Sequence, residues 1–145
     1  MSETDTGQLF QYTSVAIDGR ALLIEGPSGC GKSSLALSLI DKGAVLIGDD
    51  SVSLTVESGN LIASPAPNTR GLIEIRNVGL IELPCTPAPV SLVLTVDPDA
   101  PRFTEKAHEI TLLGYSIPTL EFALGNPADA IRAEYAMRRY GLSTD

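Results

Sequence analysis

The sequence predicts an α/β protein with a β-rich mixed sheet, a P-loop and few helices. Two observations predict it. Residues 26–33 fit G-x-x-x-x-G-K-[ST] and stand between a short apolar run and a helical pattern. Strand-like runs and turn residues then dominate the chain up to residue 126, where one more helical pattern begins. A regular doubly wound sheet would instead alternate strands with helices.

The apolar pattern defines the elements around the glycine-rich segment. Residues 13–17 are expected to form a strand, joined through a turn at Asp18-Gly19 to a buried strand at 21–25. The following helix ends at Gly43, and residues 44–47 form another buried strand. The helix carries one apolar face at core spacing, made of Leu35, Ala36, Leu39 and Ile40.

The remaining chain is expected to contain mostly strands and loops. In order we expect a hairpin at 52–56 and 61–63, a loop at 64–71, short elements at 73–76 and 79–82, a proline-marked surface connection at 84–89, an interior strand at 92–96 and a weaker strand at 110–113. Asn126 is expected to cap a last helix with Pro127 at its first position. That helix would present Ile131, Tyr135 and Met137.

Length and composition exclude several classes of protein. The 145 residues suit a single domain over residues 9–145, behind a polar segment at 1–8 that is expected to be disordered. No apolar stretch reaches the ~18 residues of a membrane span and no signal peptide is recognisable, so we expect a cytoplasmic protein without membrane contacts. The net charge of −8 argues against nucleic acid as a partner.

The glycine-rich segment has the chemistry of a phosphate-binding loop. Its glycines let main-chain N–H groups surround an anion at the start of a helix. Lys32 supplies a charge for the outer phosphates, and the Ser33 hydroxyl is placed to ligate Mg²⁺. Cys30 is either a redox-sensitive thiol or a tolerated small residue, and the second interpretation is favoured. The predicted nucleotide-binding residues are Gly26, Pro27, Ser28, Gly29, Cys30, Gly31, Lys32, Ser33 and Ser34.

Acidic residues beyond the loop are further candidates. Asp49 and Asp50 end a predicted strand, and a strand–loop–helix–strand unit can bring that end beside the P-loop. A carboxylate there can accept a proton or hold metal, and a solvated aspartate pair in a turn fits the same residues equally well. Glu74 suits a metal ligand, and Arg76 suits a contact to phosphate. The residues alone favour a different interpretation, in which both lie on the polar side of a half-buried strand.

Residues 15–50 resemble the C-terminal catalytic domain of the HPr kinase/phosphorylase family, in the short form without an N-terminal domain. The resemblance rests on the P-loop followed at this spacing by Lys42-Gly43, an apolar strand and Asp49-Asp50. Residues 73–81 resemble the second signature of the family, and the last third of the chain matches loosely.

This resemblance implies a fold related to phosphoenolpyruvate carboxykinase and transfer of the ATP γ-phosphate to a serine of HPr or an HPr-like phosphocarrier. It implies that Lys32 stabilises the phosphates and that Ser33 and Glu74 ligate Mg²⁺. It also implies that Asp50 is the base that takes the serine proton, with Asp49 as its neighbour in the motif. Arg102 is implied, on a loose alignment, as an active-site arginine, and a homo-oligomer is possible.

The sequence departs from the family pattern at two places. Gln11 stands where the family usually has a histidine, and glutamine cannot relay a proton; His108 lies elsewhere. No basic residue occurs in residues 117–122, where the arginine-rich segment of the family would fall. Both departures favour a kinase whose phosphorylase activity is weak or absent.

Two other functions fit the residues. A generic P-loop NTPase would use Asp97, at the end of an apolar run, as its Walker B carboxylate. A non-catalytic ATP-binding regulatory protein would explain Gln11 as a sign of lost catalysis. The second alternative is disfavoured because nucleotide binding alone would not require Asp50.

Overall fold

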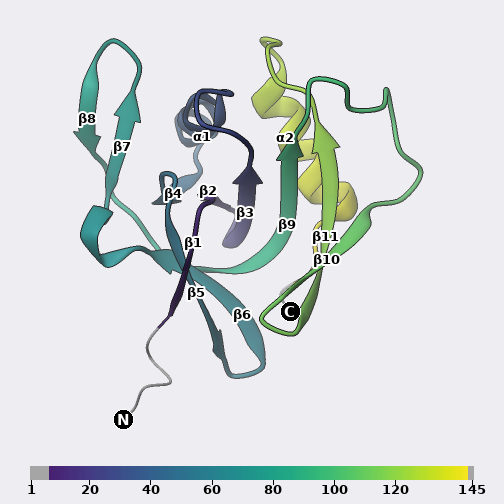
Figure 1. Cartoon of the computed structure of the whole chain (residues 1–145), viewed down its shortest axis with the longest axis horizontal. Helices are drawn as coiled ribbons and strands as arrows, with labels where there is room; N and C mark the ends of the chain where they lie inside the picture. The colour runs from purple at the N-terminus through teal and green to yellow at the C-terminus, as the bar shows by residue number, and fades with distance from the viewer. Residues whose placement is uncertain (1–6, 144–145) are drawn as a thin grey trace.

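The computed structural model describes residues 7–143, and Figure 1 shows the order of its elements. The helices are α1 (Lys32–Asp41) and α2 (Asp129–Tyr140), with one 3-10 turn at Pro67–Thr69. None of the helices in this range is long and apolar enough to cross a membrane. The strands are β1 (Gln8–Phe10), β2 (Thr13–Ile17), β3 (Arg20–Glu25), β4 (Val45–Gly48), β5 (Val52–Glu57), β6 (Asn60–Pro65), β7 (Leu72–Ile75), β8 (Gly79–Glu82), β9 (Ala88–Val96), β10 (His108–Leu112) and β11 (Tyr115–Phe122).

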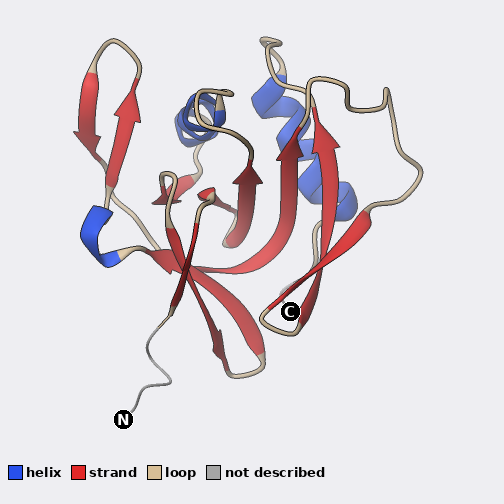
Figure 2. Ribbon diagram, viewed as in Figure 1, coloured by secondary structure: helices blue, strands red, loops and turns tan. Residues whose placement is uncertain are grey.

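One large curled sheet contains every described strand except β7 and β8, which pair with each other (Figure 2). The main order is β1-β5-β6-β9-β3-β2-β4, and β11 joins β9 with β10 beyond it. Strand β9 links the parts because its start pairs antiparallel with β6 while its remainder runs parallel to β3 and β11. This β-rich mixed sheet with few helices confirms the predicted fold class.

Period-two alternation divides the core between the two faces of the sheet. On β3, Leu22 and Ile24 point into the cluster that also holds the buried side chains of α1 and α2. Ala21 and Leu23 point into a second cluster, which the curl of β5 and β6 closes. Both faces of β3 are therefore buried, which explains why its sequence is continuously apolar.

Three parallel strands end at the same edge of the sheet. Glu25 of β3 lies opposite Thr95 of β9, and Phe122 of β11 lies opposite Val96 of β9. The glycine-rich loop and the segments that follow β9 and β11 all leave the sheet at this edge, at the top of Figure 1. Ligands of open α/β sheets bind at this kind of edge.

Two strands, β1 and β9, begin in segments where no strand was predicted. The expected disorder of residues 1–8 falls mostly outside the described residues, but Gln8 belongs to β1 and pairs with Leu54 of β5. Strand β9 also begins earlier than expected, at Ala88, inside the proline-marked connection. Pro89 is tolerated there because it lies at the start of the strand, where prolines are accepted.

The end of the chain differs more. Strand β11 was not predicted, although it pairs antiparallel with β10 through a tight turn at Leu113-Gly114. Pro118 interrupts its strand pattern, and its second partner, β9, lies more than twenty residues away. Helix α2 begins at Asp129 instead of Pro127, and Asn126 accepts a hydrogen bond from the Ala128 N–H in the turn before it. The predicted apolar face was wrong in two of its three residues: Ile131 and Tyr135 are exposed. The helix packs instead through Ala130, Ala133, Ala136 and Met137.

Candidate active site

The glycine-rich loop connects β3 to α1 and has a backbone that favours glycine. Gly29 and Gly31 have φ angles of 82° and 107°, in the left-handed region. The Cys30 N–H donates to the Pro27 carbonyl at 3.2 Å, which closes a turn between them. Helix α1 then begins at Lys32, so the free N–H groups of its first turn face the cavity beside the loop.

Lys32 is buried, and its ammonium group is held in one place. Its Nζ donates to the Gly26 carbonyl at 2.7 Å and lies 3.2 Å from Oδ1 of Asp50. The Asp50 side chain is 62% exposed, in contrast to the lysine. The pair therefore joins a fixed cation at the P-loop to a carboxylate that an incoming molecule can reach.

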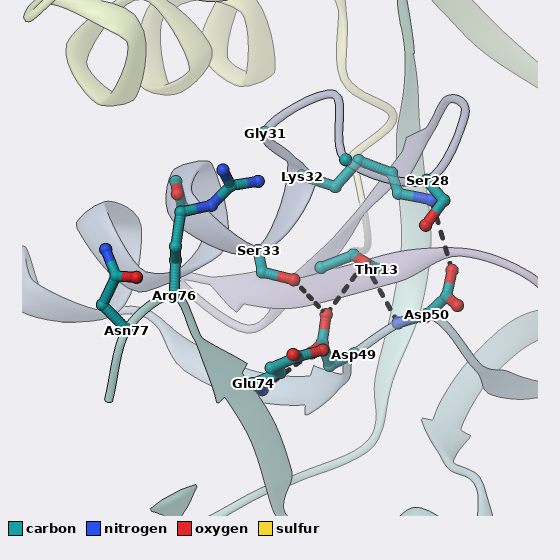
Figure 3. A pocket seen from close by; sticks show the side chains of 12 residues that line it. Thr13, Ser28, Gly31, Lys32, Ser33, Asp49, Asp50, Glu74, Arg76 and Asn77 are labelled. Atoms are coloured by element: carbon teal, nitrogen blue, oxygen red, sulfur yellow. Dashed lines mark hydrogen bonds and ion pairs between the residues drawn. The ribbon is translucent and has the colours of Figure 1, made fainter. Parts of the chain in front are cut away.

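Asp49 is the residue that ties the parts of the site together (Figure 3). Its Oδ1 accepts hydrogen bonds from the hydroxyls of Ser33 at 2.6 Å and Thr13 at 3.2 Å. Its Oδ2 accepts the backbone N–H of Glu74 at 3.0 Å. The spacing in the sequence left open whether Asp49 and Asp50 lie beside the P-loop or form a solvated turn. In the fold they lie beside the P-loop.

Thr13 is a site residue that the sequence analysis missed. Its side chain is completely buried, and its Oγ1 accepts the Asp50 N–H at 3.0 Å while donating to Asp49. This contact supports the left-handed backbone of Asp50, whose φ is 63°. The sequence gives no signal for this role because a threonine in a buried strand reads as an ordinary strand former.

The cavity between these residues has a volume of about 450 Å³. Lys32 and Arg76 supply positive charge, and Asp49, Asp50 and Glu74 supply negative charge. It is lined by Thr13, Ser28, Gly29, Gly31, Lys32, Ser33, Ser34, Asp49, Asp50, Glu74, Arg76 and Asn77. In such a mixed set, phosphates can pair with the cationic side chains and a divalent cation with the carboxylates.

The β7–β8 hairpin brings Glu74 beside Asp49 and places Arg76 on the side of the cavity opposite Asp50 (Figure 3). No three His, Cys, Asp or Glu side chains in residues 7–143 are clustered as a metal site made of protein alone would require. Mg²⁺ commonly uses one or two protein oxygens together with phosphates and water. The Ser33 hydroxyl, fixed by Asp49, and the Glu74 carboxylate fit such a donor set.

Several predicted or discussed residues lie away from this cavity. Arg102 lines a separate cavity, of about 530 Å³, beside Phe103 and α2. His108 also lines that second cavity. Gln11 is exposed and does not line the P-loop cavity. The carboxylate of Asp97 accepts the Asp99 N–H at 2.9 Å in a local turn, and this residue is likewise absent from the P-loop cavity.

The glycine-rich loop, the buried Lys32 and the Asp49-Asp50 pair together define the class of protein. It is a P-loop protein in which the acidic turn after β4 lies beside the loop. The family model of the HPr Serine kinase C-terminal domain matches residues 8–86. The chain belongs to this family, and the resemblance found in the sequence is confirmed.

Individual relatives agree with this assignment. The HPr kinase/phosphorylase of Mycoplasmopsis pulmonis is 49% identical over 72 residues, which is 49% of this chain and 23% of that protein. The protein of the same name from Clostridium botulinum (strain Eklund 17B / Type B) is 44% identical over 69 residues, 48% of this chain and again 23% of that protein. The match thus spans about a quarter of the length of these curated relatives.

A solved structure extends the likeness to nearly the whole chain. The Hpr(Ser) kinase/phosphatase from Coxiella burnetii aligns with a TM-score of 0.81 and 26% sequence identity. The alignment covers 90% of this chain and 88% of that one. The fold is therefore that of an HPr kinase catalytic domain.

Proposed function

We propose that this protein is a cytoplasmic, ATP-dependent protein serine kinase that phosphorylates HPr or an HPr-like phosphocarrier of a phosphotransferase system. The observation that carries the proposal is the 3.2 Å contact between Lys32 Nζ and the exposed carboxylate of Asp50. A serine hydroxyl brought to a terminal phosphate beside Lys32 would meet a base within the same site. Membership in the HPr kinase family supports this choice of reaction.

The proposed roles follow from the contacts. Backbone N–H groups of the loop and Lys32 would bind the phosphates, and Ser33, oriented by Asp49, would hold Mg²⁺ together with Glu74. When bound, Mg²⁺ neutralises charge on the phosphates. The serine oxygen bonds to the γ-phosphorus as its proton passes to Asp50, and the bond from the γ-phosphorus to the bridging oxygen breaks to release ADP.

A transfer assay with radiolabelled ATP and candidate phosphocarriers, followed by mapping of the modified residue, tests the proposal. Asp50→Asn is expected to lower kcat by roughly 10²–10⁴-fold, because general base catalysis contributes about that much. Asp97→Asn is the matched control and is expected to retain activity, since its carboxylate closes a local turn. Loss of transfer with Asp97→Asn alone would favour a generic P-loop NTPase. Binding of ATP without transfer to any phosphocarrier would favour a regulatory protein.

We further propose that phosphorylase activity is weak or absent. The support is that Gln11 stands where the family has a histidine and cannot relay a proton, and that residues 117–122 contain no basic side chain. In the reverse step Asp50 would return the proton to the serine oxygen, so the features that this chain lacks are the histidine relay and the cations that would bind inorganic phosphate. Incubating a phosphoserine phosphocarrier with the protein and phosphate should release little pyrophosphate, and rapid release would contradict this part of the proposal.

A further inference from the structure

A second cavity adjoins the P-loop on the side away from Asp50. Its volume is about 340 Å³, and its walls are the loop, the start of α1 and the segment that follows β11. In the sheet, β4 and Asp50 lie to one side of β3 whereas β9 and β11 lie to the other. Gly31 and Ser34 line both cavities, so the two spaces meet at these residues.

The chemistry of this second cavity differs from that of the first. Leu124 and Pro127 give it apolar walls, and a Cβ placed on Gly31 would stand 3.4 Å from Leu124 Cδ1, so this segment lies directly against the P-loop. Asn126 uses its Oδ1 to accept the Ala128 N–H at 2.8 Å, which leaves its amide nitrogen as a donor. The cavity has a single carboxylate, that of Asp129, and suits an uncharged group with a planar apolar part.

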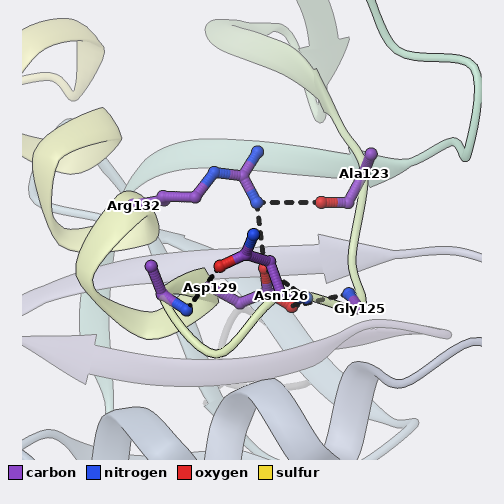
Figure 4. Close-up of polar contacts among 6 residues, drawn as sticks. Ala123, Gly125, Asn126, Asp129 and Arg132 are labelled. Carbon is purple, nitrogen blue, oxygen red and sulfur yellow. Dashed lines mark hydrogen bonds and ion pairs between the residues drawn. The ribbon is translucent and has the colours of Figure 1, made fainter.

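The wall formed by residues 123–126 is held rigidly (Figure 4). The Asp129 carboxylate accepts the N–H groups of Gly125 at 2.8 Å and Asn126 at 3.2 Å. Arg132 NH1 donates to Asp129 at 2.9 Å and to the Ala123 carbonyl at 2.9 Å. A wall fixed in this way loses little conformational entropy when a ligand binds against it.

We propose that this second cavity receives the nucleoside part of the nucleoside triphosphate, and that Leu124 is a principal contact of the base. This inference rests on the proposed function, which sets the terminal phosphate beside Lys32 and Asp50. The phosphate chain then follows the loop N–H groups towards the start of α1, and its other end leaves at Gly31 and Ser34, where the second cavity begins. Phosphate binding and base binding are thereby assigned to different walls.

Comparing ATP·Mg²⁺ with inorganic tripolyphosphate·Mg²⁺ by calorimetry tests this inference, because tripolyphosphate lacks the nucleoside. Leu124→Ala should weaken ATP binding by roughly tenfold, the loss of about half a buried leucine side chain, and leave tripolyphosphate binding within about twofold. Ser38→Phe, an exposed position on α1 that lines the cavity, should block it and give the same selective loss. Ile131→Ala, an exposed α2 position outside the cavity, is the control and should change neither affinity.

The outcomes separate the two proposals. Equal losses for both ligands, or no loss for ATP with a folded variant, would overturn the nucleoside cavity while leaving the phosphate site in place. Failure of the unmodified protein to bind either ligand would overturn both. If Leu124→Ala lost its circular dichroism spectrum, Ser38→Phe would decide, since a surface serine on a helix that makes no side-chain hydrogen bond can be replaced without disturbing the core.

Discussion

Replacing Thr13 by valine removes the hydroxyl that holds both aspartates and keeps the shape of the side chain. The hydrogen bond to Asp49 at 3.2 Å involves a charged acceptor and is worth about 1.5–3 kcal/mol. The Asp50 N–H, 3.0 Å from the same oxygen, would lose its partner at a cost of about 1–3 kcal/mol. Some relaxation will recover part of the sum, so we expect Thr13→Val to lower the free energy of unfolding by about 2–4 kcal/mol.

Urea unfolding measures this loss, with two controls on the same strand. Thr13→Ser keeps the hydroxyl and should lose about 1 kcal/mol, the value of the missing methyl group. Ser14→Ala removes the buried, neutral hydrogen bond from Ser14 Oγ to the Leu22 carbonyl at 2.8 Å and should cost about 0.5–1.5 kcal/mol. The reasoning is refuted if Thr13→Val is no more destabilising than Ser14→Ala, because the two contacts to the aspartates would then contribute nothing beyond an ordinary hydrogen bond.

Two further predictions concern the P-loop, and a third concerns a buried tyrosine of the second core cluster. Lys32→Met should weaken binding of both ATP and tripolyphosphate by at least about tenfold in calorimetry, because it removes a cation from the phosphates; unchanged affinity would contradict the phosphate site. Gly31→Ala should weaken ATP binding and lower the free energy of unfolding by about 1 kcal/mol or more, because the φ angle of Gly31 is 107°. A variant with full affinity for ATP would show that the loop adopts another backbone conformation on binding. Burial, with a smaller contribution from the charge of Glu25, raises the pKa of Tyr12 from 10.0 to about 12. The folded protein therefore keeps a proton that the unfolded chain loses, so stability from this group is complete below pH 10 and lost as pH rises to about 12. Urea unfolding of Tyr12→Phe should show a shallower decline over that range, and an identical decline would assign it to other groups.

Local patterns predicted the parts of the fold whose causes are local. The strand that feeds the loop, helix α1 and the β5–β6 hairpin each have their apolar spacing and turn residues within a few positions. Strand β11 was missed because Pro118 within it disfavours a strand and its second half pairs with the distant β9, although its hairpin with β10 is local. The packing face of α2 was mispredicted for a related reason: its alanines are buried because they allow close approach, whereas the larger Ile131 and Tyr135 were expected to dominate the contact.

The candidate site divides in the same way. The loop could be read from spacing because each glycine and the lysine have a fixed physical task. The placement of Asp50 beside Lys32 followed from topology, but the sequence could not distinguish the two aspartates, and the structure gives Asp49 the hydrogen bonds and Asp50 the ion pair. Thr13 was invisible because a threonine in a buried strand reads as an ordinary strand former, and its two partners lie 36 and 37 positions away in the chain.

The three hydrogen bonds of Asp49 have a thermodynamic consequence. They join the carboxylate to partners 36, 16 and 25 positions away in the chain, on β2, α1 and the β7–β8 hairpin. The hairpin pairs with no other described strand, so local opening there would break the contact at Glu74 first. A ligand that fixes Ser33 would slow that opening, because Ser33 and Glu74 share the Asp49 carboxylate. The exchange rate of the Glu74 amide hydrogen would therefore report ligand binding at the P-loop, some forty residues earlier in the chain.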